Sequence, residues 1–512
     1  MLHTVVSQRL ALPALKSNTR KDKACNQAIS CAVRHLTNFR RSDVKKFILV
    51  LLFSLLSMVQ ASASPLITAN LVPSRTTGVA PLAVHFDATG SVAPTLVADP
   101  FRQLSYTFTF GDNRGLKWPV SNLPKNKEVG GPVAAHVFDL PGTYTVTVAV
   151  TDPATGTQTN KKTTITVSDP DVVYAGANTI CVSGVGDWTG CPVGAQHISA
   201  IPSGNPVWSN KRILLRRGET FGDVWIQVDN ANVQVGAYGT GALPIVNSVG
   251  VGNWRPANAN FANDVTVMDL AVVLGANASV GRRFFFYRLD MTSASNEHGI
   301  YIGGTKNWAE NDTLPGRVPM SEFYYASEVF VIENKVVGSF TDGGYNYYGD
   351  GSKVAVLGNT GNTSKFHTAR FVKLRKAILA HNDFKGINSD GVYHDLKIHS
   401  GGMTPYTDAY VDDAWYSEQI VIQNNRFGST EDNNQWLVAI CPQNDQSAEG
   451  IQDVLIQSNT FTRNSRTVQD LTLAGRRLTY RGNIIQGGGS LTEGVGHDAS
   501  LPMDWKGPYY SN

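Results

Sequence analysis

The chain has 512 residues, 42% of them hydrophobic and 17% charged, and a formal net charge of +3 at pH 7. Residues 1–63 carry ten Lys or Arg and two Asp, so the rest of the chain holds 34 basic and 39 acidic residues. A mildly acidic body excludes the basic surface that marks a nucleic-acid-binding protein. The length predicts two or three domains, and 48 glycines with few long amphipathic periods predict an all-β fold.

The N-terminal segment, residues 1–63, has the pattern of an export signal. Two lysines precede the apolar run FILVLLFSLLSMV (47–59), and ASA (61–63) provides a small-x-small cleavage pattern. The apolar run is short for a transmembrane span, so we expect a signal peptide cleaved before Ser64 and no membrane span afterwards. The protein is therefore predicted to be bacterial and secreted, either extracellular or periplasmic. We expect translation to begin near Val44.

Residues 65–169 have the pattern of a β-sandwich. Several short strand-like segments follow one another between turns, which is typical of an immunoglobulin-like fold. In Tyr144–Val150, Tyr and Val alternate with Thr and Ala, which predicts a half-buried strand. The Pro141-Gly142 turn leads into this strand.

The sandwich segment also resembles a known module. FGD (110–112), followed by HVFDLPGTYTVTVAVTD (136–152), is similar to the core and the last long strand of PKD domains. The chain departs from that pattern at Thr109 and at Asn113. The resemblance implies an accessory domain, which acts as a spacer or as a weak glycan- or protein-binding unit and carries no catalysis.

The cysteines suit an exported protein. Cys181 and Cys191 lie ten residues apart in the loop-like stretch CVSGVGDWTGC, and this spacing predicts a disulfide. Cys441 follows an apolar run and is expected to be a buried, inert thiol. No Cys/His spacing typical of zinc occurs in the sequence.

After a predicted hinge at 169–171, residues 171–512 contain irregular repeats. Short units of the form apolar-x-apolar-x-x-Asn-x-apolar recur, and their asparagines are Asn334, Asn382, Asn425, Asn459 and Asn483. Intervals of one to two coils of about 20–25 residues are typical of a parallel β-solenoid. A single coil cannot bury its own apolar positions, whereas stacked coils share one core. Stacked asparagines would satisfy one another's amides at each turn.

The opening of this second region resembles a known superfamily. RILLRRGETF (212–221) and VQVGAYGTGALPIVN (233–247) are similar to the first coils of right-handed parallel β-helix proteins of the pectate-lyase-like superfamily. The fold class predicted for the whole chain is therefore all-β, a PKD-like immunoglobulin sandwich followed by a right-handed parallel β-helix. The resemblance implies proteins that degrade acidic extracellular polysaccharides by β-elimination.

A group of basic residues marks the candidate site. In ARFV (369–372) and LKIH (396–399), strand alternation places Arg370, Lys397 and His399 on the outer face. If these strands lie one coil apart, the three side chains form one patch. His367 precedes Arg370 by three residues, and Lys373 follows it, so both are candidates for the same patch.

An insertion, 403–415, follows the second of these strands. Its aromatic residues offer flat faces that stack on sugars: Tyr406, Tyr410 and Trp415. Its acidic residues offer oxygen ligands for Ca²⁺, although their spacing matches no EF-hand loop: Asp408, Asp412 and Asp413.

Lyase chemistry assigns a role to each basic residue. Elimination needs a group that neutralises the uronate carboxylate, a base and a proton donor. We expect Lys397 to be the base, Arg370 to bind the carboxylate, and His399 or His367 to assist or donate the proton. A catalytic lysine must lose its proton near neutral pH, which neighbouring cations favour.

Two alternatives stay open. One is a non-catalytic glycan-binding or adhesin-like surface protein, because outward Lys and His are also common on solvated β-helix strands. The other is a β-helix glycoside hydrolase, which would use carboxylates such as Asp412 and Asp413. A Gly-His-Gly and an Arg-x-Lys signature that would support the hydrolase is missing from the sequence.

Overall fold

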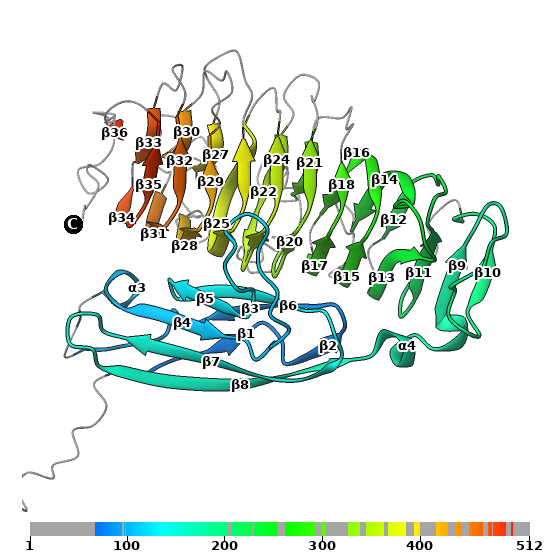
Figure 1. The fold of residues 1–512 in the computed structure, drawn as a ribbon, viewed down its shortest axis with the longest axis horizontal. Helices are drawn as coiled ribbons and strands as arrows, with labels where there is room; N and C mark the ends of the chain where they lie inside the picture. The colour runs from blue at the N-terminus through cyan, green and yellow to red at the C-terminus, as the bar shows by residue number, and fades with distance from the viewer. Residues whose placement is uncertain are drawn as a thin grey trace, which may run out of the picture. The chain divides into compact units, whose positions relative to one another are not determined.

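The computed structural model describes most of the chain from residue 67 onwards. The described ranges are 67–94, 97, 99–202, 207–227, 230–252, 262–279, 281–291, 298–303, 326–337, 345–362, 367–385, 394–399, 416–428, 436–441, 450–463, 469–473, 475–487 and 493–494. Residues 65–512 belong to one compact unit, which is built almost entirely of β-strands (Figure 1). Within the described ranges, no helix combines the length and the apolar character needed to cross a membrane.

The first part of this unit is a β-sandwich of two sheets. The smaller sheet contains, in spatial order, β1 (Val72–Pro73), β3 (Leu82–Asp87) and β6 (Val133–Phe138). The larger contains β2 (Thr77–Val79), β8 (Gln158–Ser168), β7 (Gly142–Thr151), β4 (Ser105–Thr109) and β5 (Lys127–Gly130), and a short helix α3 (Pro100–Gln103) precedes β4. The alternation predicted for 144–150 is confirmed, because Val146, Val148 and Val150 are fully buried in the sandwich core.

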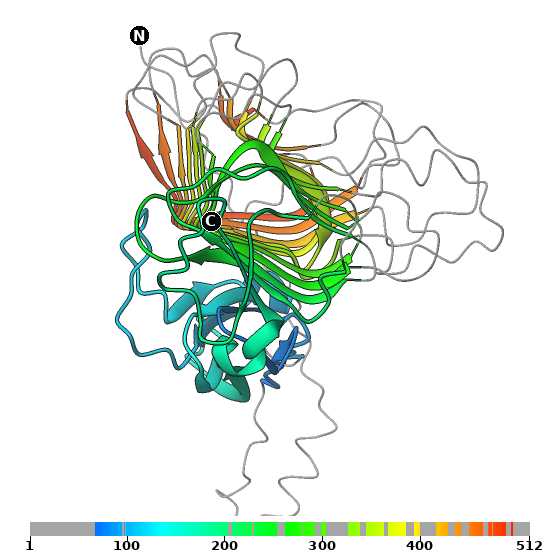
Figure 2. The same cartoon turned by 90° about the vertical axis from the view of Figure 1, so that its right-hand side faces the viewer.

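The rest of the unit is a stack of coils whose strands all pair in parallel, as a β-helix requires. Each complete coil passes through three sheets, here called A, B and C, and Figure 2 views the stack with successive strands of a sheet lying behind one another. Sheet A contains β12 (Val224–Ile226), β14 (Ile245–Val251), β16 (Ala271–Ala278), β19 (His298–Ile302), β22 (Tyr345–Ser352), the first part of β25 (Ala369–Ala380), β27 (His394–His399), β30 (Trp436–Ile440), β33 (Gln469–Leu473) and β36 (Glu493–Gly494).

Sheets B and C complete each coil. Sheet B contains β10 (Gln196–Ile198), β9 (Thr179–Val182), β11 (Arg212–Arg216), β13 (Ala231–Tyr238), β15 (Ala262–Met268), β17 (Gly281–Tyr287), β20 (Phe330–Ile332), β23 (Ala355–Leu357), the second part of β25, β28 (Tyr416–Gln423), β31 (Gly450–Gln457) and β34 (Arg476–Arg481). Sheet C contains β18 (Asp290–Met291), β21 (Lys335–Val337), β24 (Thr360–Asn362), β26 (Asp383–Lys385), β29 (Arg426–Phe427), β32 (Thr460–Thr462) and β35 (Ile484–Gln486).

A ladder of asparagines runs along the turn from sheet B to sheet C. All five asparagines predicted from the repeats belong to it, and the ladder has a further rung: Asn334, Asn359, Asn382, Asn425, Asn459 and Asn483. In each of the five successive pairs, the side-chain oxygen of the later asparagine accepts from the backbone N–H and the side-chain amide of the earlier one at 2.9–3.0 Å. The residue before each asparagine has a left-handed backbone: Glu333, Gly358, His381, Asn424, Ser458 and Gly482. The ladder therefore satisfies the buried amides at a tight, repeated turn.

The additional rung, Asn359, shows why the sequence pattern is incomplete. Its unit has Gly361 where the other units have a large apolar residue. A Cβ on Gly361 would lie 2.5 Å from the Thr368 methyl group and 3.1 Å from the Tyr347 ring, which both occupy the neighbouring space. The Tyr347 hydroxyl donates to the backbone oxygens of Asn334 and Thr360 at 3.1 and 2.8 Å. The tyrosine ring and the Thr368 methyl group thus fill the place of the missing side chain, and the tyrosine hydroxyl has its own partners.

The outer face of sheet B is apolar and packs against the sandwich. One cluster combines sandwich residues such as Trp118 and Val137 with sheet B residues such as Phe330, Ile378 and Val421. Both faces of sheet B are therefore buried between β17 and β31, which explains the uninterrupted apolar runs there. Sheet A contributes no residue to this cluster within the described residues.

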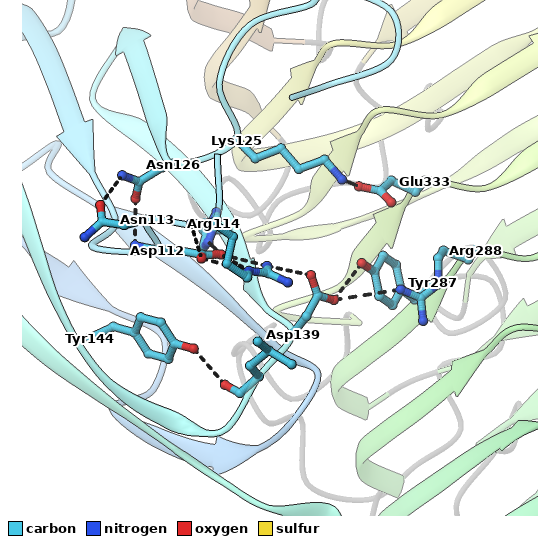
Figure 3. Close-up of polar contacts among 12 residues, drawn as sticks. Asp112, Asn113, Arg114, Lys125, Asn126, Asp139, Tyr144, Tyr287, Arg288 and Glu333 are labelled. Atoms are coloured by element: carbon cyan, nitrogen blue, oxygen red, sulfur yellow. Dashed lines mark hydrogen bonds and ion pairs between the residues drawn. The ribbon is translucent and has the colours of Figure 1, made fainter. Parts of the chain in front are cut away.

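Polar contacts surround this apolar interface. Asp139 of the sandwich accepts from Arg114 of the sandwich at 2.7 Å and from the Tyr287 hydroxyl of sheet B at 2.8 Å (Figure 3). Lys125 forms an ion pair with Glu333 at the end of β20 (Figure 3). The sandwich is thus attached to the β-helix by charged contacts as well as by apolar packing.

The chain between the two folds is short and held at both ends. Asp169 caps the helix α4 (Pro170–Val173) by accepting from the N–H of Asp171 at 2.8 Å, and Asp171 pairs with Arg212 of β11 at 2.6 Å. A one-turn 3₁₀ helix, η2 (Gly176–Asn178), then leads into β9.

The cysteines have different surroundings. Cys181 of β9 and Cys191 form a disulfide, the pair singled out by their spacing. Cys441 lies outside this disulfide and is partly exposed, so the prediction of a buried cysteine is wrong. It directly follows Ile440, the last residue of β30, and so lies just beyond the buried part of the strand.

One buried histidine at the sandwich–helix interface predicts acid sensitivity. His85 of β3 donates from Nε2 to the backbone oxygen of Lys376 in β25 at 2.8 Å. Burial, only partly offset by Asp87, lowers the pKa of His85 to about 4 from the ordinary value of 6.5. Below pH 6.5 His85 is therefore protonated in the unfolded chain, whereas in the folded chain it stays neutral until the pH falls to about 4. We expect this histidine to reduce the free energy of unfolding by about 3 kcal/mol as the pH falls from 6.5 to 4.

Urea denaturation at several pH values measures this effect, with His85→Gln as the comparison. The variant should lose less stability than the wild type over that pH interval. His136 and His367 also have lowered pKa values, so the free energy of unfolding should still fall somewhat with pH in both proteins. Equal slopes for the two proteins would show that His85 does not titrate across folding.

Candidate functional site

One outward row of side chains crosses the strands of sheet A. Tyr301, Tyr348, Arg370 and Lys397 are partners in the parallel register of β19, β22, β25 and β27. Their neighbours along each strand, such as Ala369 and Phe371, belong to the core, so all four side chains of this outer row face away from it. Strand alternation predicted the adjacency of Arg370 and Lys397, and the two are register partners.

Arg370 is the centre of this row, and neutral groups hold it in place. Its Nε donates to Nε2 of His399 at 2.9 Å, and its Nη1 donates to the Tyr345 hydroxyl at 2.6 Å. Its guanidinium lies 5.5 Å from the ring centroid of Tyr345 and 6.0 Å from that of Tyr348. Within the described residues, no carboxylate forms an ion pair with Arg370, in contrast to Arg375, which pairs with Glu418 at 2.6 Å.

A second row of rings lies where the strands of sheet A begin. His298 stacks on Tyr345 with centroids 5.2 Å apart, Tyr345 on His367 at 5.7 Å, and His367 on His394 at 4.9 Å. Tyr345 and Tyr348 also stack at 5.0 Å, so the two rows touch. The stacking fixes the position of the Tyr345 ring and, through its hydroxyl, that of Arg370.

The protonation of this cluster follows from its burial. Burial holds the pKa of His367 well below its ordinary value, and the positive charges of Arg370 and Lys397 are among the neighbouring influences that lower it further. His367 Nδ1 accepts from the backbone N–H of His394 at 2.9 Å, as a neutral ring does. His367 therefore adds no positive charge beside Lys397 at neutral pH, because burial keeps the ring neutral. Arg370 is the residue that brings this charge to the row.

Two further observations separate ligand-facing groups from supporting ones. His399 is only 1% exposed, and its Nε2 accepts from Arg370, so its ring is neutral and carries its proton on Nδ1. It therefore positions Arg370. Burial, partly offset by Arg370, raises the pKa of Tyr348, so its hydroxyl keeps its proton at neutral pH.

The predicted ligand-binding insertion, 403–415, lies outside the described residues. This applies to the predicted sugar-stacking residues Tyr406, Tyr410 and Trp415 and to the predicted calcium ligands Asp408, Asp412 and Asp413. Lys373 lies in β25, between the parts of this strand that belong to sheets A and B. Among the described residues, no group of three His, Cys, Asp or Glu side chains is arranged to hold a metal ion.

The sequence reasoning missed the tyrosines of both rows. A signal for them exists, because HGIYI (298–302) repeats the pattern of HDLKI (394–398), with Tyr301 in the place of Lys397. In YNYY (345–348) the outward position is harder to recognise, because Tyr347 points into the core while the neighbouring Tyr348 points outwards. A search for the histidine-led pattern would have found the first strand but not the second.

Comparisons with known proteins identify the sandwich. The family model described as PKD domain matches residues 63–167. The first fold is therefore an immunoglobulin-like PKD domain, as the sequence motifs indicated. No curated protein matches the chain.

Three solved structures illustrate what the chain is similar to. A GH136 lacto-N-biosidase from Eubacterium ramulus is 13% identical, with 60% of this chain and 65% of that chain covered and a TM-score of 0.34. ORF18 of Geobacillus virus E2 is 13% identical, with 54% and 50% covered and a TM-score of 0.26. A structure of carbohydrate-binding modules from the β-sandwich superfamily is 23% identical, with 20% and 35% covered and a TM-score of 0.16. The chain covers less than two thirds of the length of each.

Proposed function

We propose that the protein is exported and that the outer row of sheet A binds an acidic extracellular polysaccharide and cleaves it by β-elimination. The observation that carries the proposal is the state of Arg370, a guanidinium held by the neutral groups of Tyr345 and His399 without a carboxylate partner among the described residues. An arginine oriented in this way is suited to bind a carboxylate of a ligand through charge-assisted hydrogen bonds.

The neighbours of Arg370 suit a sugar ligand. Tyr301 and Tyr348 flank it on one side of the row and stack on each other with centroids 5.3 Å apart. Tyrosine combines an apolar ring face with a hydroxyl, and a sugar likewise presents apolar C–H faces and polar edges. Lys397 flanks Arg370 on the other side. The row therefore offers rings, a carboxylate-binding group and a base in sequence.

The proposed reaction uses three of these residues. Arg370 binds the uronate carboxylate and stabilises the charge that develops when the neighbouring carbon loses its proton. Lys397, as the neutral amine, takes that proton from C5, the C5–H electron pair forms the C4=C5 double bond, and the C4–O4 bond breaks. The leaving oxygen takes a proton from the Tyr348 hydroxyl. The positive charge of Arg370 beside Lys397 favours the neutral amine that the base requires.

The finer assignments belong to the same proposal. The β-helix is assigned to the pectate-lyase-like superfamily, and Ca²⁺ bound by Asp408, Asp412 and Asp413 would assist Arg370 in neutralising the substrate. Binding without cleavage is the alternative function. A hydrolase needs two carboxyl groups at the scissile bond, and the outer row, as far as it is described, contains tyrosine, arginine and lysine instead.

Arg370→Gln tests the binding step. Calorimetric titration with polygalacturonate, alginate and hyaluronan, and with neutral dextran as a reference, measures affinity. We expect the wild type to bind one of the acidic polymers and the variant to bind it about 10- to 100-fold more weakly, because a charge-assisted pair is lost.

Arg426→Gln is the matched control, since Arg426 is half-exposed on sheet C and lies 3.9 Å from Asp383. It should bind as the wild type does. An unchanged affinity of Arg370→Gln, or equal losses in both variants, contradicts the assignment of the binding site to the outer row.

A further inference from the structure

The outer row continues beyond Tyr301 toward the first coils of the β-helix. Tyr301 pairs in register with Asn277 of the preceding strand, β16. Asn277 pairs in turn with Gly250 of β14, and Gly250 pairs with Trp225 of β12. The residues on either side of each position, such as Val224 and Ile226, belong to the core. Trp225 and Asn277 therefore face outwards on the same side as Arg370.

Trp225 is an exposed ring supported by a glycine. Its side chain is 41% exposed, although large aromatic side chains usually gain from burial. A Cβ added to Gly250 would lie 2.1 Å from Cε3 and Cζ3 of the indole. The indole thus lies over the Gly250 backbone, in space that any other residue would occupy.

Asn277 lies between the two aromatic groups of the row. Its side chain is half-buried, and it makes no hydrogen bond to another residue in the part of the chain that the structure describes. An amide offers both donors and an acceptor, which match sugar hydroxyls. From Trp225 to Arg370 the row has six positions: Trp225, Gly250, Asn277, Tyr301, Tyr348 and Arg370.

We infer that Trp225 is a distal sugar-binding platform and that the ligand is a linear polymer lying along the row. This inference rests on the proposed function of the outer row. Adjacent positions of parallel strands are about 4.8 Å apart, so Trp225 and Arg370 are separated by about 24 Å. One pyranose unit of an extended chain is about as long as one such step, so a ligand that reaches both residues has about six units. Short oligomers reach Arg370 but not Trp225.

The test compares chain lengths in a protein that is expected to turn over its ligand only slowly. Disaccharides and octasaccharides of polygalacturonate, alginate and hyaluronan are titrated into the Lys397→Ala protein, alone and combined with Trp225→Ala or Arg370→Gln. We expect Trp225→Ala to weaken octasaccharide binding about tenfold through loss of ring stacking and to leave disaccharide binding unchanged. Arg370→Gln should weaken the binding of both lengths.

Three further variants test whether the loss is specific to the indole of Trp225. Gly250→Val should displace the indole and weaken only octasaccharide binding, as Trp225→Ala does. Ile484→Ala removes another exposed apolar side chain, 57% exposed on sheet C, and should change neither affinity. Trp225→Tyr, which keeps a ring, should restore most of the octasaccharide affinity. Thermal unfolding verifies that each variant is folded.

The outcomes separate the two claims. If Trp225→Ala binds both lengths with full affinity while Arg370→Gln loses both, the distal platform is wrong and the proposed function stands. If Ile484→Ala weakens octasaccharide binding as much as Trp225→Ala, the platform is also wrong. If no acidic oligomer binds, or Arg370→Gln binds normally, the proposed function fails, and the platform with it.

Discussion

Replacing Lys397 by alanine should lower the rate of unsaturated product formation by about 10²- to 10⁴-fold, the usual contribution of a general base. The amine is the only group of the outer row, among the residues that are described, that we assign to take the substrate proton. Arg370 keeps its partners Tyr345 and His399 in this variant, so affinity for the polymer should change much less than turnover. The rate and the affinity are measured separately, by product absorbance and by calorimetric titration.

Lys335→Ala is the matched control for this change. Lys335 is half-exposed on sheet C, 3.6 Å from Asp290, and its removal should leave the rate unaltered. A Lys397→Ala protein with the rate of the wild type removes Lys397 from the role of base. A rate that falls together with affinity assigns Lys397 to binding instead.

Replacing Asn382 by alanine should reduce the free energy of unfolding by about 4 kcal/mol, because several buried polar groups lose their partners together. The side-chain amide of Asn382 donates to the backbone oxygen of Val356 at 2.8 Å and to Asn425 Oδ1 at 2.9 Å. Its oxygen accepts from the backbone N–H and the side-chain amide of Asn359 at 2.9 and 3.0 Å. Urea denaturation followed by far-ultraviolet circular dichroism measures the loss.

The end of the ladder provides an internal comparison. Asn483 is the last rung of the described ladder and is less buried than Asn382. Asn483→Ala should therefore reduce the free energy of unfolding by less than Asn382→Ala does. Replacing Asn160, which is exposed in β8 of the sandwich, by alanine should leave the free energy of unfolding almost unchanged. Equal losses for Asn382 and Asn160 would contradict the structural role of the ladder.

The repeated asparagines predicted the parallel stack, and strand alternation predicted that Arg370 and Lys397 share the outer face and are adjacent if their strands lie one coil apart, as they do. Both depend on local rules, namely the turn geometry that each repeat needs and the alternation of side chains along a strand. The rung at Asn359 escaped prediction because Gly361 breaks the repeat, and the ring that replaces its side chain comes from Tyr347. The asparagine repeat cannot reveal such a contact, because the residue that makes it lies in a different part of the coil.

The contacts between separate strands and domains could not be predicted from the sequence for a similar reason. The run FFFY (284–287) is buried on both faces, which indicates that something covers sheet B, but the sequence does not say that the PKD sandwich does so. The bond from Arg370 to His399 depends on side-chain directions across two coils. The stacking of Tyr345 on His367 depends on where each strand of sheet A begins.

Ultraviolet absorbance of unsaturated uronates tests the central claim most directly. The wild-type protein is incubated with polygalacturonate, alginate, hyaluronan and dextran, and absorbance is followed together with the release of reducing ends. The proposed lyase produces absorbance and reducing ends in equal amounts from one acidic polymer and neither from dextran. Reducing ends without absorbance would show a hydrolase, and binding without either product would show a glycan-binding protein, so either result contradicts the elimination mechanism.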